Sequence, residues 1–330
     1  MSFKAYLIQQ KDGQTVSEFV DFTEEQLDAG EVLIAVSYSG VNYKDALAAT
    51  GKGPIIRRFP CIGGIDMAGI VVSSESPDFA PGDKVIATSY DIGVSHHGGY
   101  AQMARLPARW VLKLPQGLDL REAMALGTAG FTAGLALARM QHNDLRPDSG
   151  MVVVSGATGG VGSIAVEIFA SAGYEVHAMS GKANSEAYLR ELGASGIIQR
   201  ENIDSRRRKP LDRTVWAGAV DSLGGDVLSW MISTMKQGGV VASIGLAASA
   251  ELETTVMPFI LRGVSLLGID SGYIGEPWRS DVWALLGAEW KPEKVISQVR
   301  EITFDKLPEV FGDFLDARIS GRVVVRIGDT

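Results

Sequence analysis

The sequence has a single cysteine, Cys61, among 330 residues. One cysteine forms no internal disulfide and cannot supply a four-thiolate zinc site, so the default expectation is an intracellular protein. The sequence also lacks any run of about 18 apolar residues, so we expect no transmembrane helix. No long apolar core follows a basic flank near residue 1, and we expect no signal peptide.

Basic residues are outnumbered by acidic ones. Lysine and arginine total 31 against 39 aspartate and glutamate residues, which leaves a net charge of −8. Because affinity for nucleic acids comes from concentrated Lys and Arg, we expect no nucleic-acid partner. Hydrophobic residues make up 46% of the chain, too many for a disordered protein. At roughly 150 residues per domain, the length suggests two domains of a cytoplasmic enzyme or binding protein.

The first 123 residues contain short apolar strands separated by turn signals. Strands are expected over 31–41, 64–74 and 83–89, and a short helix over 44–51 ends at a glycine. Such strands, with Pro-Gly and Gly-Gly between them, are typical of a compact, partly open β-barrel. We expect the first domain to cover 1–123.

Strands and helices alternate in the next part of the chain, over 124–274. The expected strands lie at 151–156, 174–181, 196–200, 217–225, 238–245 and 263–271, and the expected helices at 121–140, 159–173, 184–194 and 226–236. This alternation is typical of right-handed βαβ units in a doubly wound parallel sheet that is covered on both faces. The predicted fold class is therefore α/β.

The tail over 275–330 has a different pattern. Helices are expected at 276–290 and 307–321, followed by a closing strand at 322–328. Because this strand has no helical partner after it, we expect it to return to the first domain. The tail would then complete the domain that begins at residue 1.

A glycine-rich turn follows the apolar strand at 151–156. Its sequence over 155–162, Ser-Gly-Ala-Thr-Gly-Gly-Val-Gly, has the spacing G-x-x-G-x-x-G before a helix. Gly156 permits a tight turn, Gly159 lets the backbone approach a pyrophosphate, and Gly162 lets the helix pack on the strand. The helix start adds free N–H groups and a positive dipole end. We predict dinucleotide contacts at Thr158, Gly159, Gly160 and Val161.

The end of the second strand of this domain predicts the cofactor. An NAD site has Asp or Glu there, which accepts hydrogen bonds from ribose hydroxyls. This chain has Ser180, Gly181 and Lys182, which offer a hydroxyl and an ammonium and no carboxylate to repel a 2′-phosphate. Arg200, after the third strand, is expected beside the same phosphate or the adenine. We predict NADPH rather than NADH, with an exposed lysine at a helix start as the alternative for Lys182.

Several short motifs, in order along the whole chain, carry a family resemblance. They are Val-Asn-Tyr-Lys-Asp at 41–45, Pro60 with Gly64, Asp66, Ala68 and Gly69, Pro-Gly-Asp-x-Val at 81–85, Gly-Gly-Tyr-Ala at 98–101, the glycine-rich turn, and Gly-Arg-Val-Val at 321–324. The sequence resembles the medium-chain dehydrogenase/reductase superfamily. The resemblance implies a GroES-like catalytic domain, a Rossmann nucleotide domain, a cleft between them and a homodimer.

The chain departs from the zinc-dependent members of that superfamily. Those members carry a Cys ligand, a His-Glu pair and a four-cysteine lobe, whereas Ile65 and Asp66 follow Gly64 here. His96 and His97 are adjacent, which is a poor spacing for a closed metal site, and they are expected to be loop histidines. The sequence is therefore most similar to the zinc-free, quinone-oxidoreductase-like and enoyl-reductase branch, and we expect no metal.

Two blocks, 127–133 and 254–271, are similar to those of the NADPH-dependent acryloyl-CoA reductase group. This resemblance implies reduction of a short enoyl-CoA, acryloyl-CoA to propanoyl-CoA, by hydride transfer to the β-carbon. The alternatives are an NADPH:quinone reductase and an NADPH-binding protein with little catalysis. Three basic residues are either contacts for the CoA phosphates or exposed loop charges: Lys52, Arg57 and Arg58.

Tyr43 is the candidate catalytic residue at the nicotinamide. It lies in a motif that resembles the family's nicotinamide-facing turn, and its phenol can donate to a substrate carbonyl or pack on the ring. The alternative is a buried tyrosine with a satisfied hydroxyl. Asn42 and Asp45, the other catalytic candidates, are expected to hold that turn and the ribose or amide of the cofactor. The resemblance places four further residues along the nicotinamide and the adjacent cofactor surface: Leu246, Ile260, Ser271 and Arg322.

Overall fold

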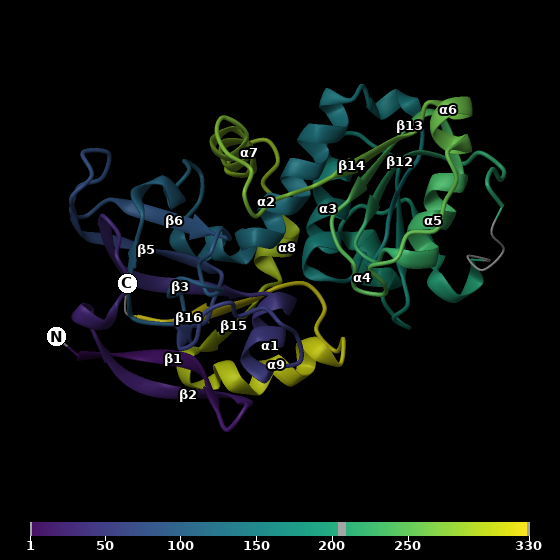
Figure 1. Cartoon of the computed structure of the whole chain (residues 1–330). Helices are drawn as coiled ribbons and strands as arrows, with labels where there is room; N and C mark the ends of the chain where they lie inside the picture. The colour runs from purple at the N-terminus through teal and green to yellow at the C-terminus, as the bar shows by residue number, and fades with distance from the viewer. Residues whose placement is uncertain (1, 204–208, 329–330) are drawn as a thin grey trace. The chain divides into compact units, whose positions relative to one another are not determined.

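The computed structural model describes residues 2–203 and 209–328, which are drawn in Figure 1. The chain forms two compact units. The first consists of Met1–Thr128 and Gln298–Thr330, and the second of Ala129–Ser297. The predicted α/β fold is confirmed, because the first unit is built on mainly antiparallel strands and the second on a parallel sheet between helices.

The first unit has two sheets. The order in the larger sheet is β15-β16-β3-β5-β6-β8, with β7 also paired to β3, and the order in the smaller sheet is β2-β1-β4. The strands are β1 (Ser2–Lys11), β2 (Gln14–Thr23), β3 (Val32–Val41), β4 (Cys61–Ile62), β5 (Asp66–Ser74), β6 (Lys84–Thr88), β7 (Met103–Leu106), β8 (Val111–Lys113), β15 (Arg300–Thr303) and β16 (Val323–Arg326), with helices α1 (Tyr43–Thr50) and α9 (Leu307–Leu315).

The closing strand returns to the first unit, as predicted. β16 pairs antiparallel with β3, with Val323 opposite Val41, and Figure 1 shows the yellow strand beside the blue one. The apolar β3 is buried along most of its length, because its side chains pack into the core of the unit on both faces. The end of β3 leads directly into α1, so the start of this helix is anchored to the middle of the larger sheet.

The second unit contains a six-stranded sheet in the order β11-β10-β9-β12-β13-β14, and every neighbouring pair is parallel. From β9 the chain adds two strands on one side and then returns to add three on the other, which is the predicted doubly wound arrangement. The strands are β9 (Val152–Val154), β10 (Val176–Ser180), β11 (Gly196–Gln199), β12 (Trp216–Asp221), β13 (Met235–Ser243) and β14 (Ser265–Gly268). The connecting helices include α3 (Gly160–Ser171), α4 (Glu186–Glu191), α5 (Gly225–Ser233) and α6 (Met257–Arg262).

The predicted domain bounds at 123 and 275 differ from the bounds of the two units. After 275, α7 (Trp278–Leu286) and α8 (Glu293–Ser297) belong to the second unit. The Trp283 ring of α7 stacks on Phe131 with 6.1 Å between ring centroids, and the Glu167 carboxylate of α3 accepts backbone N–H groups at the start of α8. Because these contacts hold both helices against the second unit, only the chain from Gln298 onward completes the first.

The long helix α2 (Leu120–His142) is apolar enough and long enough to cross a membrane by composition alone. In the structure, 83% of its apolar window is buried, which is typical of a core helix. The helix is kinked at Gly127, whose φ of 51° and ψ of −151° are not helical. The kink was not predicted, because a glycine inside an apolar helical pattern does not by itself end the pattern.

Candidate active site

The glycine-rich turn of the second unit has the geometry that an anion site needs. Gly156 adopts a φ of 58°, a conformation that favours glycine, and a Cβ on Gly162 would lie 2.3 Å from the carbonyl oxygen of Gly156. Gly159, the N-cap residue of α3, has no side chain to cap the helix, and the first N–H groups of a helix have no acceptor within it. The positive end of a buried helix therefore begins beside backbone that only glycine allows, which fits a pyrophosphate.

The end of β10 brings several of the predicted cofactor residues together. The Ser180 hydroxyl accepts the backbone N–H of Lys182 at 3.0 Å and lies 3.4 Å from the Thr158 hydroxyl. A Cβ on Gly181 would lie 3.4 Å from the Arg200 guanidinium, so this cation lies over the glycine. Burial lowers the pKa of the Lys182 ammonium. Two cationic side chains thus flank the turn that follows β10, which fits a 2′-phosphate.

Three other predicted cofactor residues lie elsewhere in the second unit. Leu246 follows β13 and Ile260 lies in α6, and these apolar side chains are 67% and 72% exposed. Ser271 follows β14, and its hydroxyl accepts a hydrogen bond from Thr132 at 2.7 Å. The contact of these three residues with a cofactor stays a prediction.

In the first unit, Asn42 and Asp45 form a capping box at the start of α1. The Asp45 carboxylate accepts the backbone N–H of Asn42 at 2.9 Å and that of Ile65 at 3.0 Å. Burial raises the pKa of Asp45 to about 7, and the nearby Asp66 carboxylate adds to the rise. Because both Asp45 oxygens are used by backbone donors, the geometry favours the prediction that this residue holds the turn.

Tyr43 is the first residue of α1, and its side chain is 48% exposed. Among residues 2–203 and 209–328, none forms a hydrogen bond with its hydroxyl. The alternative interpretation, a buried tyrosine with a satisfied hydroxyl, is therefore wrong. The phenol is available for a substrate, whereas the backbone beneath it is fixed by the capping box.

Arg322 lies inside the first unit, with 3% of its surface exposed. Its guanidinium donates to Ala125 O at 2.8 Å, Val41 O at 3.2 Å and Asn42 Oδ1 at 3.1 Å. Its Nη2 is buried without a hydrogen-bond partner in the part of the chain that is described. The residue thus ties the end of β3 to α2 and to the cap of α1. The predicted contact of Arg322 with the cofactor stays a prediction.

Sequence reasoning missed the other members of this buried cluster. Asp66 was quoted only as part of a motif, yet its carboxylate is completely buried and accepts hydrogen bonds from Asn42 and Thr128. The Tyr100 hydroxyl donates to Gly40 O at 3.2 Å. The available signal was a carboxylate at the start of an otherwise apolar strand, where an unpaired charge would be costly.

Two of the three basic residues proposed for the CoA phosphates are paired with carboxylates. Arg58 binds Asp28 at 2.5 Å, and Arg57 lies 3.9 Å from Asp91. Lys52 is exposed in the turn that follows α1. The local geometry therefore favours Lys52 over Arg58 as a contact for an anionic ligand.

The surroundings of Cys61, His96 and His97 are typical of residues with a structural role. Burial raises the pKa of the Cys61 thiol to about 12, which disfavours a nucleophilic thiolate. His97 accepts the backbone N–H of Ile62 at 3.0 Å through Nδ1, and Nε2 of His96 lies 3.1 Å from Ala29 O. Among the described residues, no group of three His, Cys, Asp or Glu side chains is placed to hold a metal ion. A metal-free protein stays a prediction.

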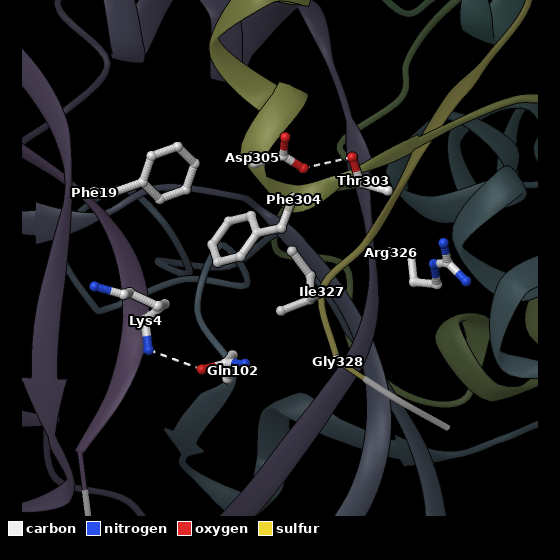
Figure 2. Close-up of a pocket in the computed structure, with 9 residues that line it drawn as sticks. All are labelled: Lys4, Phe19, Gln102, Thr303, Phe304, Asp305, Arg326, Ile327 and Gly328. Carbon is white, nitrogen blue, oxygen red and sulfur yellow. Dashed lines mark hydrogen bonds between the residues drawn. The ribbon is translucent and has the colours of Figure 1, made fainter.

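A pocket of about 550 Å³ opens in the first unit and shares no lining residue with these clusters (Figure 2). In Figure 2 the Phe304 ring lies between the Phe19 ring and the Ile327 side chain, with Lys4 on the left of the view and Arg326 on the right. Its lining residues are Lys4, Phe19, Gln102, Thr303, Phe304, Asp305, Arg326, Ile327 and Gly328. None of them is a predicted site residue.

Comparisons with known families match both parts of the chain. The model described as "Alcohol dehydrogenase GroES-like domain" matches residues 28–116, and the model described as "Zinc-binding dehydrogenase" matches residues 160–287.

Two similar proteins cover almost the whole chain. The "Putative quinone oxidoreductase YhfP" of Bacillus subtilis is 47% identical over 96% of this chain and 97% of its own length. The "Probable acrylyl-CoA reductase AcuI" of Escherichia coli is 44% identical over 98% of this chain and 99% of its own length.

Two solved structures share the fold. The yhdH oxidoreductase of Salmonella enterica, in complex with NADP, is 43% identical, with a TM-score of 0.96 over 98% of this chain and 100% of that one. The yhfP protein of Bacillus subtilis, with NAD bound, is 46% identical, with a TM-score of 0.96 over 99% of both chains.

Proposed function

Because the chain belongs to the medium-chain dehydrogenase/reductase family of oxidoreductases, we propose that it reduces the activated C=C bond of a short enoyl-CoA with NADPH. The proposed substrate is acryloyl-CoA and the product propanoyl-CoA. Two observations, one in each unit, carry the proposal: the nucleotide turn before α3 in the second unit, and the half-exposed phenol of Tyr43 at the capped start of α1 in the first.

The choice of NADPH rests on the residues after β10. The related structures contain NADP in one case and NAD in the other, so relatedness alone does not decide the cofactor. In this chain, Lys182 and Arg200 flank Gly181, and residues 180–182 contain no carboxylate. A 2′-phosphate would receive charge-assisted hydrogen bonds there, which an uncharged 2′-hydroxyl does not form.

When bound, the reduced nicotinamide would supply a hydride to the β-carbon of the enoyl thioester, and a proton from an acid or from water would complete the reduction at the α-carbon. The protein's own part is to orient the thioester and to stabilise the charge that develops on its carbonyl oxygen. Tyr43 fits this role because its hydroxyl is accessible while its backbone is held by the capping box of Asn42 and Asp45. A fixed donor aimed at a developing oxyanion lowers the barrier without reorganisation.

A quinone reductase is the second candidate, because a relative with 47% identity carries that name. The same hydride donor and the same phenol serve a quinone carbonyl. The third alternative, an NADPH-binding protein with little catalysis, needs no accessible donor at Tyr43. Consumption of NADPH with acryloyl-CoA, crotonyl-CoA and a small quinone in parallel separates the three, and no consumption above background with any of them would leave only the third.

We propose that the protein is cytoplasmic and that it forms a homodimer. Most of the exposed large apolar side chains among the described residues lie between Leu246 and Tyr273. These residues come before and after β14 in the sequence, and β14 is an end strand of the parallel sheet whose outer edge has no partner strand in the described structure. A second copy that covers this edge and these side chains would bury both features. Light scattering at micromolar concentration tests it, and a strictly monomeric mass would contradict it.

A further inference from the structure

The Asp66 carboxylate joins segments that are distant in the sequence. Its Oδ2 accepts hydrogen bonds from Asn42 Nδ2 at 2.8 Å and from the Thr128 backbone N–H at 2.9 Å, and its Oδ1 accepts the Thr128 hydroxyl. Asn42 caps α1, and Thr128 follows the kink of α2. A single completely buried side chain at the start of β5 thus ties the start of one helix to the bend in another.

Two glycines leave the space that this carboxylate occupies. A Cβ on Gly127 would lie 2.4 Å from Asp66 Oδ2, and a Cβ on Gly40 would lie 3.1 Å from the same atom. Gly127 also adopts a φ of 51°, which favours glycine. The bend in α2 and the end of β3 are therefore shaped around the carboxylate.

Asn42 links Asp66 to Tyr43, because its side chain donates a hydrogen bond to Asp66 and its backbone directly precedes Tyr43. The Asn42 amide nitrogen also lies 3.2 Å from Asp45 Oδ2, and its amide oxygen accepts from Arg322 at 3.1 Å. With both ends of its amide held, Asn42 defines where α1 begins, and Tyr43 is the next residue. Because about half of Tyr43 is exposed, packing alone does not fix its placement, and the cap adds to it.

Four ionisable groups share this interior: Asp45, Asp66, Tyr100 and Arg322. Burial raises the pKa of Asp45 to about 7, with the charge of Asp66 as the second cause. Burial also raises the pKa of Tyr100 and lowers that of Arg322. Loss of the Asp66 charge would let Asp45 ionise at lower pH.

We propose that Asp66 is a positioning residue for Tyr43, acting through Asn42 and Thr128. The consequence for catalysis rests on the proposed function, whereas the consequences for α1 and for proton uptake by Asp45 are properties of the protein alone. A failure of the proposed function and a failure of the positioning role can therefore be told apart.

The first variant is Asp66→Asn in the full chain. We expect kcat for the enoyl-CoA to fall by about tenfold or more, with KM for NADPH within about twofold, because the change displaces Tyr43 and leaves the turn after β10 intact. In a Tyr43→Phe background the same substitution should lower kcat by less than about threefold. Equal losses of kcat in the wild-type and Tyr43→Phe backgrounds would overturn the proposal that Asp66 acts on catalysis by positioning Tyr43.

Two measurements on the protein without substrate complete the test. Hydrogen exchange of the amides at 43–47 should rise in Asp66→Asn by at least about fivefold, while exchange in the β1–β2 hairpin stays as in the wild type. The fall in thermal stability with rising pH should move to lower pH, because Asp45 has lost its negative neighbour. A merely space-filling role for Asp66 would not move this pH dependence.

Thr128→Val and Thr128→Ser form a milder matched pair, which carries the test if Asp66→Asn does not fold. Valine removes the hydroxyl that Asp66 accepts, and serine keeps it. We expect Thr128→Val to loosen α1 and Thr128→Ser to restore wild-type exchange. Wild-type exchange and pH dependence in both Asp66→Asn and Thr128→Val would overturn the proposal whatever the activity. Loosening of α1 in a protein that reduces no enoyl-CoA would sustain it and refute the proposed function.

Discussion

Replacement of Asp45 by asparagine should remove a large part of the pH dependence of stability. Asp45 is completely enclosed at the start of α1, and its pKa is raised from 3.8 to about 7 by burial and then by the charge of Asp66. The folded protein therefore binds this proton more tightly than the unfolded chain does. The stability that the proton contributes is complete below about pH 4 and is lost as the pH rises through about 7.

The magnitude follows from the shift. At about 1.4 kcal/mol per pKa unit, the free energy of unfolding of the wild type loses about 4 kcal/mol across the whole range from this group. About 3 kcal/mol of that falls between pH 5 and pH 8. The Asp45→Asn variant cannot ionise at this position. Between pH 5 and pH 8, the free energy of unfolding of the wild type should therefore fall by about 3 kcal/mol relative to that of the variant.

Urea unfolding followed by far-ultraviolet circular dichroism, at constant ionic strength and at several values between pH 5 and pH 8, measures this difference. Asp12→Asn, which removes an exposed carboxylate in the β1–β2 turn, is the matched control and should follow the wild type. If Asp45→Asn also kept the wild-type slope against pH, the reasoning about the buried cluster would be refuted.

Three further predictions concern the cofactor, the phenol and metals. Lys182→Ala should raise KM for NADPH by about tenfold, or roughly 1.4 kcal/mol, and leave KM for NADH nearly unchanged; equal losses would contradict the 2′-phosphate assignment. Tyr43→Phe should lower kcat by about 10–100-fold, or roughly 1.4–2.7 kcal/mol, with a smaller effect on NADPH affinity, and near-full kcat would reassign Tyr43 to cofactor placement. Exhaustive chelation should leave activity and Tm unchanged, and stoichiometric zinc lost together with activity would overturn the metal-free prediction.

The nucleotide turn could be predicted from the sequence because its signals are local. An apolar strand, three glycines at fixed spacing and a helical pattern follow one another within about twenty residues, and each has its own physical cause. The structure places Gly156 and Gly162 in contact, as the spacing implies. Ser180, Gly181 and Lys182 at the end of β10 were predictable for the same reason, since they are consecutive, whereas Arg200 comes after the next strand.

The buried cluster of the first unit could not be predicted in the same way. Asp66 meets Asn42 and Thr128 across 24 and 62 residues of chain, and no periodicity in the sequence connects them. The kink at Gly127 was hidden inside a helical apolar pattern, although it makes room for Asp66 Oδ2. Arg322 is the first residue of the predicted closing strand, an ordinary position, and only the pairing of β16 with β3 brings it into the interior.

The most direct test of the central claim is the ratio of kcat/KM for acryloyl-CoA to kcat/KM for a simple quinone, with NADPH held at saturation. Binding of the CoA portion can be used to orient the alkene, and a small quinone offers no such handle. The proposed function predicts a ratio well above about ten, that is, more than roughly 1.4 kcal/mol of additional transition-state stabilisation. Reduction of the quinone without measurable reduction of acryloyl-CoA would contradict it.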